Sequence, residues 1–410
     1  MKSTSPLILA LTSLPLALSC QKDHRDTPNI YHPIELDTKT AQMVVSNNQF
    51  GFNSFKELAN TKENLFISPL SISQALGMVY NGATGKTAIE ISNVLGYQNP
   101  LPDDINQSSK TLREALLNAD KSVDFSVANS IWYSLLFDIH PDFTRSNQTY
   151  YDSETNALDF SDTEASKNTI NSWVNDQTKG KIPSIVEQIK PENVMFLINA
   201  VYFKGQWKYK FDKSNSSLRA FYNNRTEEKQ VTAMTQEAGL GYYANNDFTT
   251  VEMPYGNSHF SMVVLLPNAD KTTQDIVAQL TPENWNTWVS SMTQTNVKIY
   301  LPKFKMECDL NLNDCLVQLG MPSAFSGSAE FSNMGTPANL AIDEVKHKTF
   351  VEVGEEGTEA AAVTSIGIVT TSYPPTSPTP VIFDVDRPFV FIIREKDTNS
   401  VIFLGQVYSL

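Results

Sequence analysis

The sequence predicts a single α+β domain with mixed or antiparallel sheets. Three observations lead to this prediction. Apolar residues recur at the three-to-four spacing of helices from about Thr40 to Asp120. Beyond that region, short apolar runs rich in β-branched and aromatic residues predominate, which is typical of strands. No internal repeat and no long linker divides the chain, so we expect these helices and strands to share one fold.

Composition narrows the class of protein. The 410 residues include 31 lysines and arginines against 45 aspartates and glutamates, and the formal net charge is −14. A hydrophobic content of 41% is that of a globular protein and excludes wholesale disorder and a polytopic membrane protein. Nucleic-acid binders are normally basic, so we expect no nucleic-acid partner. Three cysteines are too few for a disulfide scaffold.

Residues 1–19 are predicted to be a secretory signal peptide. Lys2 precedes an apolar run from Leu7 to Leu18, and the small residue Ser19 follows that run. A basic start, a short apolar stretch and a small residue at the cleavage point are typical of such signals. Because the run is too short to span a bilayer stably, we expect the chain to be exported.

Residues 16–20 resemble a bacterial lipobox, in which the last residue, here Cys20, is lipidated after cleavage. Ordinary secretion with an incidental Cys20 is the alternative. Gln21 rather than aspartate follows the cysteine, which in Gram-negative sorting indicates the outer membrane, facing the outside or the periplasm. We interpret the polar residues 20–40 as a lipidated tether and residues 41–410 as a single domain.

Helices are expected first in the folded part of the chain. The first helix is predicted from apolar positions at helical spacing: Ala41, Val44, Val45, Phe50, Phe52, Phe55 and Leu58. Ser68-Pro69 begins a second helix, because a capping residue followed by proline is typical of a helix start. A further helical stretch includes 112–117, and later helices are expected near 164–177 and 309–319, the last capped by Asp309.

Strands are expected later, at 125–132, 194–203, 261–267, 297–302 and 389–393. Cys308 and Cys315 would lie on one helix about 10 Å apart, beyond disulfide reach, so both are predicted to be buried free thiols.

A long loop is predicted at about 355–382. Small residues fill its first part, and four prolines follow between 374 and 380. The flanking segments 350–353 and 381–393 have strand character. A loop of this length inside a compact domain is usually functional or disordered, and we expect it to be exposed and accessible to proteases.

No catalytic signature accompanies this loop. The sequence contains five histidines, but none lies in a zinc-protease motif, and no cysteine–histidine cluster has zinc spacing. A nucleophile elbow, a phosphate-binding loop and a dinucleotide fingerprint are also missing from the sequence. We therefore expect no enzymatic activity, no metal and no cofactor.

Four motifs resemble the serpin family, and they occur in the family's order. They are residues 64–72 (NLFISPLSI), 199–207 (NAVYFKGQW), 356–362 (EGTEAAA) and 383–393 (FDVDRPFVFII). With the lipobox, the chain resembles a bacterial lipoprotein serpin. The resemblance implies three sheets, eight to nine helices, an exposed reactive loop and a monomeric suicide inhibitor that traps serine proteases by inserting the cleaved loop into a sheet.

The hinge of such a loop must enter a closed sheet, which demands small side chains. The residues that match the family's hinge are Glu355, Gly357, Thr358, Glu359, Ala360, Ala361 and Ala362. Alternation from Thr358 places threonine, alanine and isoleucine on one face and leaves Glu359 on the other. No proline interrupts 357–372, so a ladder can form.

The scissile bond is predicted between Thr371 and Ser372. Counting fifteen positions from Gly357 leads there, and the Ser-x-Pro-Pro that begins at Ser372 resembles the family's sequence after the cut. Val369 and Thr370 are alternative cleavage positions. A small β-branched residue suits an elastase-like pocket, so we expect elastase-like serine proteases as targets, with a broad range that includes some cysteine proteases.

Other positions match the family's mechanical sites. Ser68, Ser71, Asn199 and His347 match the polar shutter under the opening sheet, and Trp207 matches the breach above it. Ordinary core packing is the alternative for Trp207, and a solvated or core role for His347. Few cations lie between 101 and 124, so we expect no heparin partner. The alternative function is a non-inhibitory surface binding protein of the same fold.

Overall fold

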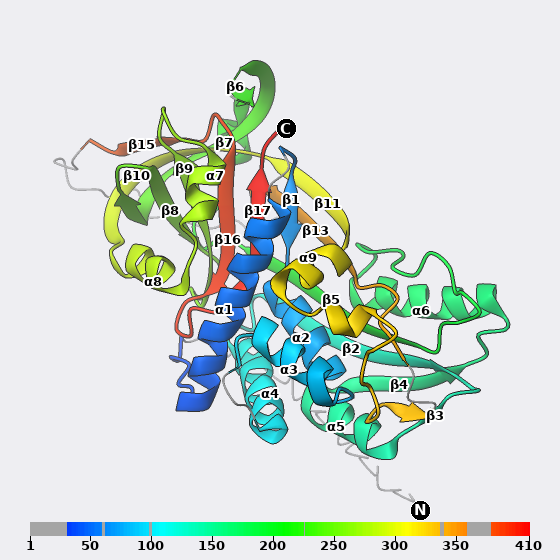
Figure 1. The fold of residues 1–410 in the computed structure, drawn as a ribbon. Coiled ribbons are helices and arrows are strands. Elements are labelled where there is room, and N and C mark those ends of the chain that lie inside the picture. The colour runs from blue at the N-terminus through cyan, green and yellow to red at the C-terminus, as the bar shows by residue number, and fades with distance from the viewer. Residues whose placement is uncertain (1–30, 60–61, 98–100, 225, 337–339, 359–378) are drawn as a thin grey trace, which may run out of the picture.

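The structure, a computed structural model, describes residues 31–410 except 60–61, 98–100, 225, 337–339 and 359–378. Nine α-helices lie in these residues (Figure 1). They are α1 (Thr38–Leu58), α2 (Pro69–Tyr80), α3 (Gly85–Val94), α4 (Pro102–Asn118), α5 (Pro141–Tyr151), α6 (Thr163–Gln177), α7 (Thr273–Ala278), α8 (Pro282–Ser290) and α9 (Asn313–Leu319).

Local chemistry explains where the first helices begin. The Asp37 carboxylate accepts hydrogen bonds from the free backbone N–H groups of Lys39 and Thr40 and so caps α1. Ser68 caps α2 through the N–H of Ser71, and Pro69 occupies the first helical turn, where its missing N–H costs nothing. The predicted start of the second helix is confirmed.

The six-stranded sheet has the order β11-β13-β14-β5-β2-β4. Its strands are β11 (Phe304–Asn311), β13 (Lys346–Gly354), β14 (Gly357–Thr358), β5 (Met195–Gln206), β2 (Asp124–Ser134) and β4 (Ser153–Leu158). Helix α6 covers one face of β5 and β2 through an apolar cluster that includes Ile170, Val174 and Ile198.

A nine-stranded sheet packs against this one. Its path is β1-β17-β16-β9-β8-β7-β10-β15, with β6 paired to β7. These strands are β1 (Leu65–Ile67), β6 (Ser217–Asn223), β7 (Glu227–Ala244), β8 (Phe248–Pro254), β9 (Phe260–Pro267), β10 (Thr293–Pro302), β15 (Val381–Asp384), β16 (Phe389–Glu395) and β17 (Val401–Val407). Short strands β3 (Asp138–Ile139) and β12 (Gly335–Thr336) form a third sheet.

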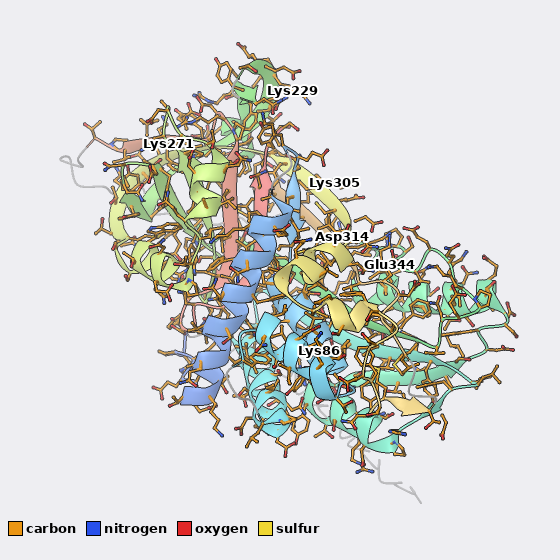
Figure 2. All side chains as sticks on the ribbon, viewed as in Figure 1. Lys86, Lys229, Lys271, Lys305, Asp314 and Glu344 are labelled. Carbon is orange, nitrogen blue, oxygen red and sulfur yellow. The ribbon has the colours of Figure 1, made fainter. Side chains whose placement is uncertain are left out.

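The core lies between the sheets and under the first helices. Helix α1 packs against β17 (Figure 1), and its buried Phe52 and Phe55 join a cluster with Val390 and Leu404. Charged side chains such as Lys86, Lys229 and Lys305, labelled in Figure 2, are exposed. The α+β class, the three sheets and the eight to nine helices expected from the sequence are confirmed.

The segment from 309 to 319 differs from the prediction. Asp309 lies inside strand β11 rather than capping a helix, and α9 begins only at Asn313. Cys308 therefore lies on a strand and Cys315 on a helix. Both are free thiols, as predicted, but Cys308 is only partly buried. The prediction ran the two elements together because strand β11 ends at Asn311 and helix α9 begins at Asn313.

The folded body also begins earlier than the boundary drawn at residue 41. Helix α1 starts at Thr38, and Tyr31 and Ile34 contact Asp397 at the far end of the sequence. Residues 31–40 are thus part of the folded body rather than of a tether. Within the described residues, no helix combines the length and apolar character needed to cross a membrane.

Candidate functional site

Strand β14 lies between β5 and β13 and is only two residues long. It is antiparallel to both: Thr358 pairs with Val353 on one side and Gly205 on the other. Gly357 pairs likewise with Gly354 and Gln206. The predicted hinge residues Gly357 and Thr358 therefore already occupy the first positions of a strand between two others.

Beyond β14, β5 and β13 each have an edge without a ladder partner among the described residues. β5 pairs with β2 on its other side over residues 195–204, and β13 pairs with β11 over residues 346–353. No ladder joins β5 to β13 directly in the described part of the chain. The backbone groups on these two facing edges match those of one further antiparallel strand.

Gly357 must be glycine because it packs directly against the backbone of β5. A Cβ at this position would lie 2.0 Å from the carbonyl oxygen of Gly205 and 2.8 Å from the Cα of Gln206. Gly205 is also restricted, because its Cβ would come within 2.9 Å of the Tyr255 ring. Two glycines thus allow the hinge, β5 and an aromatic ring to meet.

Thr358 is buried, with its side chain 2% exposed, and its Oγ1 lies 2.5 Å from the hydroxyl of Tyr255. The Tyr255 ring stacks on Trp207 with 4.4 Å between ring centroids. Burial raises the pKa of Tyr255, so this hydroxyl stays protonated and can donate to the threonine. The first inward-facing residue of the hinge therefore has a polar partner inside the core.

Trp207, the predicted breach residue, holds the chain just before the hinge. Its indole Nε1 donates to the carbonyl of Gly354 at 2.8 Å, and its backbone N–H donates to the carbonyl of Glu356 at 2.9 Å. Core packing was the alternative for this residue, and Trp207 is indeed buried. Its two hydrogen bonds show that it also fixes the turn that leads to Gly357.

The two glutamates of this turn are held by lysines. Lys303 Nζ lies 2.9 Å from Glu355, and Lys210 and Lys213 both reach Glu356 at 3.2 Å. Burial opposes ionisation of Glu355, but the hydrogen bonds from Lys303 and Ser216 outweigh it and lower the pKa of this carboxyl below its ordinary value. The turn is therefore charged and anchored at neutral pH.

The predicted shutter residues are brought together under the sheet. The backbone N–H of Ser68 donates to His347 Nε2 at 3.0 Å, and Ser68 Oγ accepts from the N–H of Ser71. Ser71 Oγ donates to Asn199 Oδ1 at 2.5 Å, and Asn199 Nδ2 donates to Asn129 Oδ1 at 2.6 Å. This chain links β13 to β5 and β2 through the start of α2.

His347 is 5% exposed, which excludes a solvated role for it. Burial lowers its pKa to about 4, so the imidazole is neutral at physiological pH. A neutral Nε2 can accept the hydrogen bond from Ser68, whereas a protonated one could not. The network is therefore complete only with a neutral histidine.

Several predicted positions lie outside the described residues. These are Cys20, the hinge residues Glu359, Ala360, Ala361 and Ala362, and the cleavage positions Val369, Thr370, Thr371 and Ser372. Of the hinge, the structure describes Glu355, Gly357 and Thr358.

Sequence reasoning missed Tyr255 and Asn129. Tyr255 follows Pro254 at the end of a buried strand. From the sequence, an aromatic residue at such a position cannot be told apart from a residue that only packs in the core. Asn129 is a polar residue inside the strand run 125–132 and is 1% exposed. A buried amide in a strand needs a partner, so this interruption of an apolar run was the available signal.

Comparison with known proteins agrees with this geometry. A family model described as Serpin (serine protease inhibitor) matches residues 45–410. The chain is 37% identical over 373 residues to a leukocyte elastase inhibitor of Xenopus laevis, covering 88% of this chain and 97% of that protein. It is 35% identical over 387 residues to serpin B4 of Homo sapiens, covering 89% and 98%.

A solved serpin structure is also similar to the structure of this chain. The native state of the thermophilic serpin Tengpin matches with a TM-score of 0.82 at 32% identity, covering 93% of this chain and 97% of that one.

Proposed function

The chain belongs to the serpin family of protease inhibitors, and we propose that it inhibits by inserting its cleaved loop between β5 and β13. No enzyme family is indicated by its relatives. The observation that carries the proposal is the position of β14, which starts a strand between two edges that have no other ladder partner in the described residues.

The register of β14 determines where each inserted residue would lie. Thr358 faces Val353 and Gly205, so residue 360 of the cleaved loop would face Val351 and Phe203. Continuing antiparallel, residue 364 would face His347 and Asn199, at the level of the polar shutter. Residue 368 would face Met195, the first residue of β5, so insertion through residue 368 uses the full length of that strand.

The side chains suit this path. Thr358 points into the core, and alternation sends residues 360, 362 and 364 to the same face. These residues are alanine, alanine and threonine, which are small enough to enter above the buried Phe203 and Val351. The negative charge of Glu359 would face the opposite side of the sheet. Small inward residues favour inhibition over the non-inhibitory binding function.

The chemistry belongs to the target protease. Its serine Oγ attacks the carbonyl carbon of Thr371, and its histidine transfers the serine proton to the departing amine of Ser372. The peptide bond breaks and an ester joins Thr371 to the protease. Insertion then carries the protease along the sheet and distorts its active site before water can hydrolyse that ester.

The target class follows from the residue at the cut. Threonine at 371 fits a shallow pocket, and neither lysine nor arginine occurs from 357 to 372. The relative named leukocyte elastase inhibitor supports an elastase-like serine protease. Cleavage at Val369 or Thr370 shortens the inserted strand by only two residues or one. Several proteases, including some cysteine proteases, can therefore be trapped.

We also propose that the protein is a bacterial lipoprotein of the outer membrane, anchored through Cys20. The support is the lipobox-like sequence at 16–20 and Gln21 after the cysteine. Residues 21–30 can extend at most about 35 Å, so the folded body would stay close to the membrane surface. Labelling with a radioactive fatty acid tests this, because a Cys20→Ser variant should take up none.

A denaturing gel tests the inhibitory function. The purified protein is incubated with neutrophil elastase, and a covalent band is expected near the sum of the two masses less the released carboxyl-terminal fragment. Mass spectrometry of the released carboxyl-terminal fragment should find Ser372 at its start. Complete cleavage without a covalent band, repeated with several proteases, would instead establish the non-inhibitory binding protein.

A further inference from the structure

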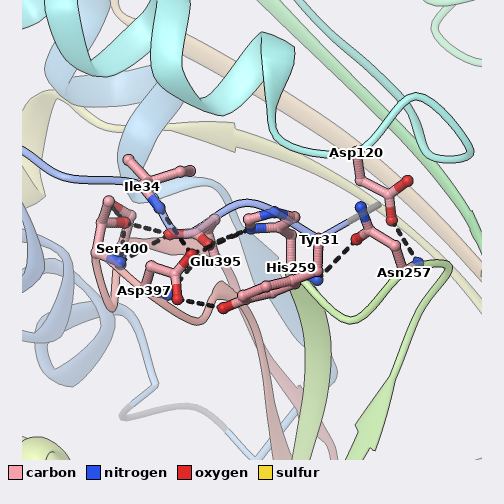
Figure 3. Close-up of polar contacts among 9 residues, drawn as sticks. Tyr31, Ile34, Asp120, Asn257, His259, Glu395, Asp397 and Ser400 are labelled. Atoms are coloured by element: carbon pink, nitrogen blue, oxygen red, sulfur yellow. Dashed lines mark hydrogen bonds and ion pairs between the residues drawn. The ribbon is translucent and has the colours of Figure 1, made fainter. Parts of the chain in front are cut away.

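Three side chains from distant parts of the sequence meet on the side of the molecule where the amino-terminal segment crosses it (Figure 3). His259 lies in the turn between β8 and β9, Glu395 ends β16, and Asp397 lies in the turn before β17. Their nitrogen and carboxylate oxygen atoms all lie within 4.8 Å of one another. The inhibitory mechanism uses none of the three.

The His259 imidazole makes one long hydrogen bond within this trio, to Glu395 at 3.3 Å. His259 Nδ1 lies 3.3 Å from Glu395 Oε1 and 3.3 Å from Asp397 Oδ2. Charge-assisted hydrogen bonds between such groups measure about 2.7–2.9 Å, and one nitrogen carries only one hydrogen. Two ligand atoms bound tetrahedrally at about 2.0–2.1 Å from a zinc ion lie about 3.3 Å apart. The two distances from the His259 nitrogen therefore also match those between ligands of one cation.

Surrounding hydrogen bonds orient both carboxylates. The backbone N–H and the hydroxyl of Thr398 donate to Glu395 Oε2, and the N–H of Asp397 donates to Oε1. The N–H of Ile34 donates to Asp397 Oδ2 at 2.9 Å, and the Tyr31 hydroxyl donates to the other oxygen, Oδ1. Such outer contacts are what hold metal ligands in place.

Burial and charge also favour a cation. His259 and Glu395 are 1% and 0% exposed, and His259 is the sole basic group in an ion pair with Glu395 or Asp397 within the described ranges. The neighbouring Arg394 and Lys396 pair with Glu252 instead. Asp397 lies at the surface with its side chain 17% exposed, so the trio combines a buried carboxylate with one that solvent can reach.

Tyr31 covers the trio. Its ring stacks on the His259 imidazole with 4.1 Å between centroids and an angle of 15° between planes. The Tyr31 hydroxyl also donates to Asp397, so the residue contacts two members of the trio. The amino-terminal segment thus closes over the three groups.

We propose that His259, Glu395 and Asp397 bind one divalent transition-metal ion of the zinc class, with water in the fourth position. One imidazole and two carboxylates are ligands that zinc accepts. The bound ion would fasten residues 31–34 to the turns at 259 and 397. The sequence predicted no metal because a search for local spacing cannot detect ligands 136 residues apart. This site is independent of protease inhibition.

Zinc alone is the probe for the test. The full chain is stripped with a chelator and dialysed against zinc chloride with a competing chelator, and bound metal is counted by mass spectrometry. One zinc per chain is expected. Asp397→Asn should weaken binding at least tenfold, because it replaces a carboxylate ligand by an amide, whose one oxygen can still accept from either Tyr31 or Ile34. The matched control Asp343→Asn, which alters a surface pair with Lys190, should bind as the wild type does.

Three measurements decide the outcome. Hydrogen exchange at the amide of Ile34 should slow when zinc binds, since that amide donates to Asp397. X-ray absorption at the zinc edge of the wild-type chain, which needs no variant, should show nitrogen and oxygen ligands with imidazole scattering. Sulfur scattering would instead identify an adventitious thiol site at Cys20, Cys308 or Cys315. That result, the lack of stoichiometric binding, or equal binding by Asp397→Asn would overturn the proposal.

Discussion

The Tyr255 hydroxyl lies 2.5 Å from Thr358 Oγ1, and this contact fixes the first inward residue of the hinge inside the core. Tyr255 in turn stacks on Trp207, whose indole binds the carbonyl of Gly354 just before the hinge. The hinge is therefore anchored on both sides of Gly357. Its start is inserted in a sheet while the rest of the loop, outside the described residues, carries the predicted scissile bond.

Replacing Thr358 by arginine should convert the inhibitor into a substrate. Position 358 is already buried beside Tyr255 in the intact chain, where a long cation would lose its hydration, so arginine would displace the start of the strand from which insertion proceeds. The number of inhibitor molecules consumed per elastase inactivated should rise at least tenfold, as measured by titration of residual activity. Thr358→Ser, which keeps the hydroxyl, is the control and should inhibit normally. An unchanged titration for the arginine variant would contradict the insertion path.

Gly357→Ala should release the hinge from β5. The new Cβ would lie 2.0 Å from the carbonyl oxygen of Gly205, and neither backbone can yield without losing its pairing. The amide of Trp207 donates to Glu356 in the intact turn, so its hydrogen exchange should become at least tenfold faster. Gly327→Ala is the control, since no atom lies within 4 Å of its added carbon. Equal exchange in the two variants would refute the tight packing.

The stability of the native state should fall in mild acid because of His347. Its pKa is about 4 in the folded protein and 6.5 ordinarily, so between these values the unfolded chain binds a proton that the folded chain does not. The contribution is fully present above pH 6.5 and is lost as the pH falls toward 4. The loss approaches about 3 kcal/mol. Unfolding followed at pH 7 and 4.5 measures it.

His347→Gln should flatten this pH dependence, because glutamine does not titrate. His32→Gln is the matched control, since His32 is exposed, and it should keep the wild-type slope. If both variants keep the slope, a group other than His347 is responsible.

Cleavage of the loop by a protease that is not trapped should raise thermal stability. Insertion would give the cleaved loop ladder bonds with both β5 and β13, whose facing edges have no ladder partner beyond β14 among the described residues. The midpoint of thermal unfolding, followed by circular dichroism, should move above about 90 °C. Cleaved Thr358→Arg should show no such rise. A wild-type midpoint unaffected by cleavage would exclude insertion.

Much of the fold was predictable from local patterns. The apolar runs at 261–267 and 297–302 fall within strands β9 and β10, and Ser68-Pro69 begins α2 as expected. These features depend on side-chain period and on capping, which are properties of neighbouring residues. The segment at 309 failed because a strand and a short helix meet there within a few residues, and the local pattern does not separate them.

The shutter residues could be predicted from the sequence only in part. Ser68, Ser71, Asn199 and His347 were expected together because of a family resemblance, and the structure joins them in one hydrogen-bonded chain. Asn129 completes that chain, and no motif singled it out. The hydrogen-bond partner of Asn129 comes from another strand, which only folding brings next to it. The local sequence pattern therefore does not reveal this hydrogen bond.

Local sequence established that the hinge has a glycine, small residues on alternate positions and no proline, which are the requirements for a mobile strand. Only the folded chain decided that Thr358 would meet Tyr255, that two strand edges would face one another beyond it, and that His259 would lie between Glu395 and Asp397. The reason is physical. Backbone preferences act between near neighbours, whereas burial, electrostatics and ladder pairing depend on segments that folding brings together.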